Sequence, residues 1–251
     1  MRCPECARER TKVVRNPGGT PGSSDAPATY ALIALCVAVY IGEIASGGTM
    51  GGGGGTLTLD FGLITGGPGV EAGVAGGEPY RLVTAAFLHA SLLHLGLNML
   101  GLYFLGVLIE PAVGTARFLG IYFFSVLAGS LGALILDPNT LTVGASGGIF
   151  GLMSAAFLIA RHRGLDDLAS QIGFFVLINV VFTFSVSNIS IGGHLGGLAG
   201  GALAAWLLTR LEGRGLSNRN AIEIGTLVAL CAIAAVAGLL VADASVPPQF
   251  A

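Results

Sequence analysis

A serine at the start of an apolar helix is the residue of this sequence best suited to nucleophilic chemistry. Ser146 lies in the run Gly144-Ala145-Ser146-Gly147-Gly148, and the apolar residues that follow predict a helix. The free N–H groups and the positive dipole end at a helix N-terminus can hold an anion. This position therefore suits a nucleophile whose reaction generates an oxyanion.

A histidine 48 residues later has a similar setting, because His194 also opens a glycine-rich apolar helix. Small residues spaced four apart let membrane helices approach closely. Both segments carry such a series: Gly147, Gly151 and Ala155 in the first, and Gly193, Gly197 and Gly201 in the second. Packing alone would explain the glycines, but not why each series begins beside a reactive side chain. We therefore predict a Ser–His dyad, with His194 as general base toward Ser146 and then general acid toward the leaving amine.

Asp137, followed by Pro138, is interpreted as an ordinary turn residue and not as a third catalytic group.

A third polar cluster lies near position 94, and we assign it to one helix. His94 and Asn98 are four residues apart and share a helix face. Polar groups are costly in hydrocarbon unless they face the bundle interior, where these two can donate hydrogen bonds to an oxyanion. His89, His94 and His194 lack the spacing and the carboxylate of a zinc site, so no metal or other cofactor is expected.

The composition is that of an integral membrane protein. The chain of 251 residues is 53% hydrophobic and 10% charged, with a mean hydropathy of +0.80, whereas soluble domains carry about 25% charged residues. The net charge of −2 and the lack of a basic patch argue against nucleic-acid binding. Seven apolar segments are candidates for crossing the bilayer: 28–46, 87–109, 116–136, 146–161, 168–187, 193–210 and 221–242. We therefore expect an all-α polytopic protein in which the short segment 146–161 is central.

The basic residues predict the topology. With the N-terminus in the cytoplasm and seven alternating helices, eleven of the twelve Lys and Arg residues fall on the cytoplasmic side, and Arg81 is the exception. Ser146 and His194 then start their helices at the same depth, near the outer surface. The C-terminus lies outside.

The rest of the chain divides as follows. Residues 1–27 predict a disordered cytoplasmic tail. Its Cys3-Pro4-Glu5-Cys6 is either a stub or the remnant of a zinc module completed by another chain. Residues 28–210 contain six of the seven predicted spans, and 47–86 form an external loop whose later part, 80–87, turns amphipathic and suggests an interfacial element. A cytoplasmic linker (211–220), an additional transmembrane helix (221–242) and an external tail (243–251) complete the chain.

Together these motifs resemble the rhomboid intramembrane serine proteases, over about residues 80–205. The resemblance rests on Gly144-Ala145-Ser146-Gly147, on the cluster of His89, His94 and Asn98, and on His194 with Gly197 and Gly201. Further similar positions are Tyr80-Arg81, where the family has Trp-Arg, and Glu110, Gly114 and Arg117 after the second span.

The resemblance implies a rhomboid-like six-helix bundle plus a seventh helix, as in bacterial rhomboids of the six-plus-one kind. It implies that Ser146 attacks a peptide bond of a transmembrane substrate near the outer leaflet, with His194 as base. His94, Asn98 and the Ser146 amide would bind the oxyanion. Phe150 stands where some members have a tyrosine stacked on the catalytic histidine, and it keeps the ring without the hydroxyl. His89, Gly144, Gly147, Gly197 and Gly201 would support the packing of the site.

Two other functions stay open on the sequence. One is a catalytically inactive rhomboid-like chaperone that binds membrane helices, against which the presence of Ser146 and His194 speaks. The other is a transporter, against which the lack of paired half-repeats speaks; Glu43 is the one acid well inside a span. Substrate access is expected from the side, with the aromatic-rich segment 168–187 as a candidate gate: Phe174, Phe175, Phe182 and Phe184.

Overall fold

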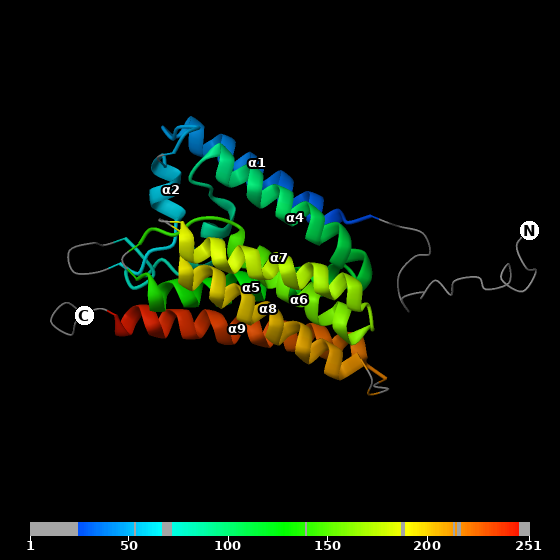
Figure 1. Cartoon of the computed structure of the whole chain (residues 1–251). Coiled ribbons are helices and arrows are strands. Elements are labelled where there is room, and N and C mark those ends of the chain that lie inside the picture. Colours follow the sequence, from blue (N-terminus) through cyan, green and yellow to red (C-terminus); the bar gives the residue numbers. More distant parts are fainter. Residues whose placement is uncertain are drawn as a thin grey trace, which may run out of the picture.

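A computed structural model describes residues 25–52, 54–66, 72–138, 140–186, 189–212, 214 and 217–245. Within these ranges the chain is nearly all helical, and the long helices lie side by side in one bundle (Figure 1). The predicted all-α fold is confirmed. Cys3, Cys6 and most of both predicted tails lie outside the described residues. The elements are α1 (Pro27–Ala45), α2 (Thr56–Phe61), α3 (Arg81–Thr84), the 3₁₀ turn η1 (Ala85–Phe87), α4 (Leu92–Val113), α5 (Thr115–Leu136), α6 (Ser146–His162), α7 (Asp166–Ser185), α8 (Ile191–Glu212) and α9 (Arg219–Ala244).

Each predicted span has a helical counterpart, although one begins later than expected. Within the described residues, six helices are long and apolar enough to cross a membrane: α1, α4, α5, α7, α8 and α9. The seventh, α6, has 17 residues, and residues 148–156 in its middle are all buried. The predicted span 87–109 corresponds to α4, which starts at Leu92 because the Ser91 hydroxyl caps it by accepting from the His94 N–H at 3.2 Å. His89 therefore precedes this helix, and its assignment to the helix was wrong. The amphipathic stretch 80–87 forms the separate elements α3 and η1.

Glycines bring α6 and α8 into backbone contact. A Cβ at Gly197 would meet the backbone of Gly147, and a Cβ at Gly201 would meet the backbone of Gly151. The Ser154 hydroxyl of α6 also donates to the Leu198 carbonyl of α8 at 2.7 Å. The helices α6 and α8, which carry Ser146 and His194 in their first turns, are thus packed with their backbones in direct contact.

A third helix, α5, packs against both of them with glycines that the sequence analysis did not single out. A Cβ at Gly129 would lie 2.8 Å from the Gly193 carbonyl oxygen and 3.4 Å from the Gly147 Cα. A Cβ at Gly132 would collide with the carbonyl of Gly192. Three helices therefore meet at the level where the candidate site lies.

The carboxylate of Glu110 caps the start of α1 from another helix. It accepts from the backbone N–H groups of Ala28 at 3.0 Å and Thr29 at 2.9 Å, and from the hydroxyls of Thr29 and Thr115, both at 2.8 Å. Glu110 is 1% exposed, and α1 has no side-chain cap of its own. A negative group at a helix N-terminus satisfies free N–H groups and opposes the dipole. This residue therefore joins α1 to the turn between α4 and α5.

Glu110→Ala is expected to lower the stability of the bundle by about 3 kcal/mol, because it leaves buried donors without an acceptor. Glu110→Gln retains one carbonyl oxygen and is expected to lose roughly half as much. The midpoint of thermal unfolding in detergent measures both. Asp166→Ala is the control, since it removes an exposed ion pair to Arg161 at 2.6 Å, a kind worth below about 1 kcal/mol. Equal midpoints for Glu110→Ala and Asp166→Ala would contradict the capping role.

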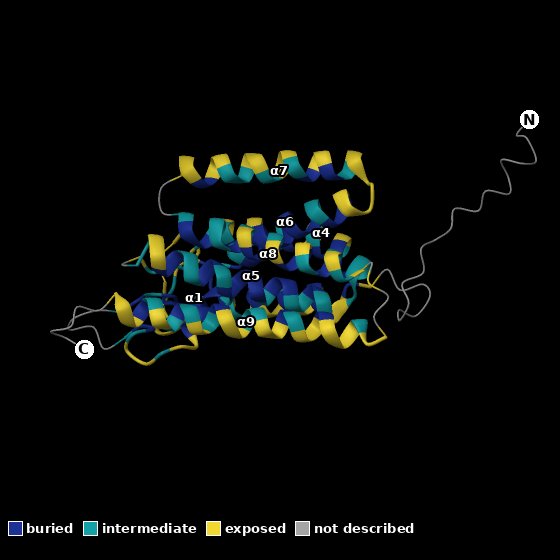
Figure 2. Ribbon diagram, turned by 90° about the horizontal axis from the view of Figure 1, so that it is seen from below, coloured by how far each residue is buried: buried dark blue, intermediate teal, exposed yellow. Residues whose placement is uncertain are grey.

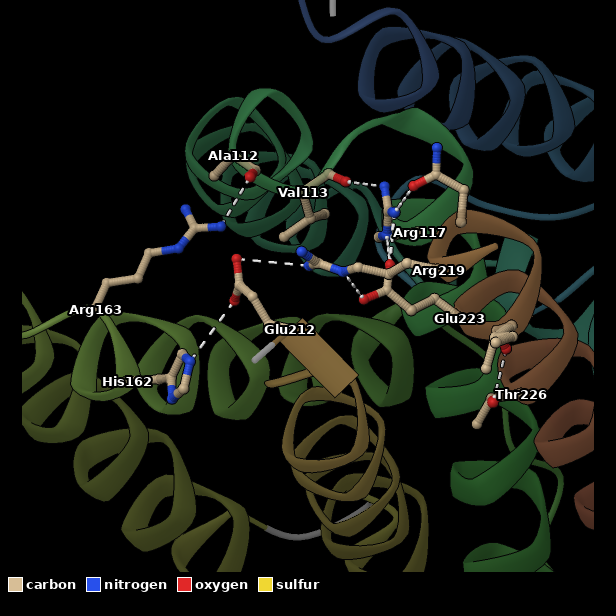
Figure 3. A network of polar contacts seen from close by, with 11 residues as sticks. Ala112, Val113, Arg117, His162, Arg163, Glu212, Arg219, Glu223 and Thr226 are labelled. Atoms are coloured by element: carbon tan, nitrogen blue, oxygen red, sulfur yellow. Dashed lines mark hydrogen bonds and ion pairs between the residues drawn. The ribbon is translucent and has the colours of Figure 1, made fainter. Parts of the chain in front are cut away.

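A buried ion cluster fastens α9 to the core at the end of the bundle where α5 begins (Figure 3). Glu223 of α9 is fully buried and accepts from Arg117 of α5 at 2.6 Å and from Arg219 at 2.7 Å. Arg219 also lies 3.5 Å from Glu212 at the end of α8. The buried carboxylate of Glu223 is thus paired with two arginines of the protein, and its pair with Arg117 links α9 to α5.

The helix α7 lies at the edge of the bundle (Figure 2). It packs mainly against α6, and within the described residues it makes few contacts with α4. The four phenylalanines expected on this helix are 50% to 61% exposed. Like α4 and α9, α7 thus presents an exposed apolar surface suited to contact lipid or another membrane helix.

Candidate active site

Ser146 is the first residue of α6, and the segment before it is fixed from two sides. The Gly144 N–H donates to the Ala85 carbonyl at 2.9 Å, and Thr142 pairs with Leu63 in an antiparallel bridge. Gly144 has a φ of +124°, a conformation that favours glycine. The turn that presents Ser146 is therefore held to the first loop and to η1.

The imidazole of His194 lies in the first turn of α8 and is fixed on one face and at one nitrogen. The Phe150 ring of α6 stacks on it, with centroids 4.0 Å apart and an interplanar angle of 21°. Its Nδ1 lies 2.8 Å from the Thr183 hydroxyl of α7. Phe150 and Thr183 leave Nε2 as the nitrogen available for a reaction.

The start of α8 is anchored by Asp137, which the sequence analysis interpreted as an ordinary turn residue. Its Oδ2 accepts from the Ser190 hydroxyl at 2.8 Å and from the Gly192 N–H at 3.1 Å. A carboxylate at this position satisfies a free helix N–H and favours the dipole. Asp137 therefore fixes the chain two residues before His194, although it is not bonded to the His194 ring.

His94 of α4 presents a donor toward Ser146. The Ala90 N–H donates to His94 Nδ1 at 3.3 Å, and since a backbone N–H can only donate, the ring proton must be on Nε2. A Cβ built on Gly144 would lie 2.8 Å from His94 Nε2 and 3.8 Å from Ser146 Oγ. The Cβ position of Gly144 thus lies between the His94 ring and the Ser146 hydroxyl. Any residue larger than glycine would place a side chain in this space.

Asn98 and His89 both contact His94. The Asn98 side chain is buried and donates to the His94 carbonyl at 2.8 Å, which leaves its second amide hydrogen available. His89 is 2% exposed, its ring centroid is 5.2 Å from that of His94, and its N–H donates to Glu43 at 2.9 Å. Glu43, the acid inside the first span, also accepts from the Thr58 hydroxyl at 2.6 Å. Glu43 therefore joins α1 to α2 and to the segment that precedes α4.

The structure thus brings together Ser146, His94, His194, Phe150 and Gly144 from three helices and one turn. Ser146, His94 and His194 are each half-buried. Among the hydrogen bonds of the described residues, none joins the Ser146 hydroxyl to the His194 ring. In the same part of the chain no group of three His, Cys, Asp or Glu side chains is arranged to hold a metal ion.

The first loop is stabilised by Arg81, beside the site. This residue is 1% exposed and donates to the Leu59 carbonyl at 2.7 Å, to the Gly62 carbonyl at 2.6 Å and to Glu78 at 2.7 Å. The Gly73 N–H, Arg81 and the Tyr80 hydroxyl all donate to Glu78 and lower the pKa of its carboxyl to about 2. Glu78 therefore stays ionised across the physiological range.

The sequence that builds this site matches a known protein family. The family model for the rhomboid domain matches residues 76–211, a range that contains Ser146, His194 and His94. The chain belongs to the rhomboid family.

Two relatives come from Bacillus subtilis strain 168. The protein named rhomboid protease GluP is 35% identical over 215 residues, which are 84% of this chain and 39% of GluP. YdcA is 35% identical over 152 residues, which are 58% of this chain and 75% of YdcA. The chain therefore spans well under half of the length of GluP.

Proposed function

We propose that this protein is an intramembrane serine endopeptidase that cleaves transmembrane proteins with a dyad of Ser146 and His194. The observation that carries the proposal is that Ser146 starts α6 near the His94 Nε2–H, on a helix whose backbone contacts that of α8, which carries His194. Membership of the rhomboid family and the name of GluP support the same activity.

In the proposed mechanism the Ser146 oxygen attacks a substrate carbonyl while Nε2 of His194 takes the hydroxyl proton. The negative charge then develops on the carbonyl oxygen. The Ser146 N–H and the His94 Nε2–H are the donors for this oxyanion, joined by the free amide hydrogen of Asn98. His194 next passes its proton to the leaving amine, and water hydrolyses the acyl intermediate by the reverse sequence.

The proposed substrate is a single-span or other membrane protein that reaches the site from the lipid beside α7. The exposed phenylalanines of α7 and its few contacts with α4 support this route. A substrate helix must unwind locally, because helical carbonyls are already engaged in hydrogen bonds. We place the catalytic core at 28–210 and treat α9 as an appended helix without a catalytic role.

The proposed orientation has the N-terminus in the cytoplasm and the C-terminus outside. Five basic residues occur in the tail, and Arg117, Arg161, Arg163, Arg210, Arg214 and Arg219 fall at the same predicted side. Arg81 lies at the opposite side, where it is buried and paired with Glu78. The site is thereby assigned to the outer half of the membrane.

The test is labelling of the purified protein in detergent with a fluorophosphonate probe, together with incubation of reconstituted protein with a panel of single-span proteins. We expect the probe to modify Ser146 and mass spectrometry to find cleavage in the outer half of a substrate span. An inactive membrane-helix-binding chaperone would bind the same proteins, stay unlabelled and release no fragments. That result would overturn the proposal.

A further inference from the structure

A buried threonine on α7 contacts the candidate base. The Thr183 hydroxyl lies 2.8 Å from His194 Nδ1, and Thr183 is 1% exposed. The same hydroxyl donates to the Asn179 carbonyl one turn earlier in α7, also at 2.8 Å. Thr183 therefore joins His194 to the backbone of a neighbouring helix through two consecutive hydrogen bonds.

The chemistry of these groups fixes the direction of both bonds. A carbonyl oxygen can only accept, and a threonine hydroxyl has one hydrogen to donate. If that hydrogen goes to Asn179, the oxygen of Thr183 must accept from an N–H at His194 Nδ1. The opposite arrangement, with the hydroxyl donating to Nδ1, would lose the bond to Asn179. In the neutral imidazole, both contacts are satisfied only when the ring proton is on Nδ1, which leaves Nε2 unprotonated.

Among the described residues, no other neighbour of His194 selects this state. Stacking on Phe150 fixes the plane of the ring, but it is equally compatible with a ring turned by half a rotation, which exchanges the nitrogen and carbon positions. Asp137 is engaged by Ser190 and by the Gly192 N–H. Within the described residues, the hydroxyl of Thr183 is the one polar group bonded to the His194 ring.

We infer that Thr183 is a positioning residue, which holds His194 in the tautomer and orientation that leave Nε2 free to accept the Ser146 proton. Acyl-transfer sites generally need a third group that orients the base, and here a neutral hydroxyl on α7 supplies it. The inference rests on the proposed protease function and adds that α7 contributes a side chain to the site. It also gives the buried Thr183 hydroxyl a chemical reason to be present between the phenylalanines Phe182 and Phe184.

The kinetic test compares Thr183→Val, which keeps the shape but removes the hydroxyl, with Thr183→Ser, which keeps the hydroxyl. With a reconstituted single-span substrate, Thr183→Val is expected to lower kcat about 10- to 100-fold, the range for a lost hydrogen bond to a group that becomes charged, with KM within about twofold. Thr183→Ser is expected to stay within about threefold of the unsubstituted protein. Thr226→Val is the matched control, because Thr226 makes the same bond within its own helix, to Ile222 at 2.8 Å, on α9.

A spectroscopic test needs no turnover. The chain has four histidines, so ring ¹⁵N signals of His194 can be assigned by their loss in His194→Gln. We expect the Nδ1–H tautomer in the unsubstituted protein and in Thr183→Ser, and a mixture or the Nε2–H tautomer in Thr183→Val. An Nε2–H signal in the unsubstituted protein, an unchanged kcat in Thr183→Val, or an equal loss in Thr183→Ser would overturn the inference. Failure of the proposed function looks different: no Ser146-dependent cleavage in the unsubstituted protein, whatever the tautomer.

Discussion

Ser146→Ala is expected to lower kcat/KM for a single-span substrate by at least about 10⁴-fold, because the variant lacks the hydroxyl that forms the acyl intermediate. His194→Ala is expected to cost a similar factor, since an unassisted hydroxyl is a weak nucleophile at neutral pH. The two residues act in one proton transfer. The double variant should therefore be about as slow as either single variant, and the two effects should not multiply.

Two control variants separate this prediction from general damage. Ser185→Ala changes an exposed serine of α7 that bonds only within its own helix, to Val181, and His162→Ala changes a half-exposed histidine near Glu212, at the end of α6 away from Ser146. Both are expected to cleave within about twofold of the unsubstituted protein. Cleavage is measured as initial rates in proteoliposomes. A Ser146→Ala protein that cleaves at the original rate would show that the proposed nucleophile is wrong.

The features that could be predicted from the sequence are those that depend on the spacing of residues within one helix. Apolar runs predicted the membrane spans. The four-residue spacing of Gly147 and Gly151, and of Gly197 and Gly201, predicted the faces of α6 and α8 that contact each other. The start of α4 at Leu92 was also readable, because Ser91 is a good N-cap and stands directly before an apolar run. We missed it because the apolar residues before Ser91 continued the pattern.

The features that could not be predicted depend on polar partners far apart in the chain. Asp137 has a local explanation as a turn residue beside Pro138, whereas its partners Ser190 and Gly192 are 53 and 55 residues away. Thr183 is unremarkable in sequence among apolar residues, and only the packing of α7 on α6 and α8 puts its hydroxyl at His194. Such contacts depend on helix rotation and rotamers that a single sequence does not fix.

Glu223 lies between these cases. Its pair with Arg219 is an i, i+4 pair that the sequence displays openly. Its pair with Arg117, 106 residues earlier, required the structure. The resemblance to the rhomboid family had already singled out Arg117 and Glu110, so for these two residues the structure supplies the physical reason: one fastens α9, and the other caps α1.

Gly197→Leu is expected to prevent folding of the bundle. A Cβ at this position would meet the carbonyl oxygen, carbon and Cα of Gly147, and backbone atoms cannot rotate aside as the end of a side chain can. The helices α6 and α8 would have to separate, and Ser146, one residue before Gly147, would move with α6. Gly197→Ala is the graded case, with an expected loss of about 2–3 kcal/mol of stability and at least about a tenfold loss of activity.

The matched control is Gly225→Leu, because Gly225 is an exposed residue of α9 with open space around its Cβ position. It makes the same change of size in a transmembrane helix and is expected to leave both quantities near their original values. The thermal midpoint in detergent and the rate of fluorophosphonate labelling are measured on all three variants. If Gly197→Ala retained the original midpoint and labelling rate, α6 and α8 would not need backbone contact to present Ser146 to His194. The close contact between Gly147 and Gly197 would then contribute little to stability, and it could not be the reason that Ser146 and His194 lie near each other.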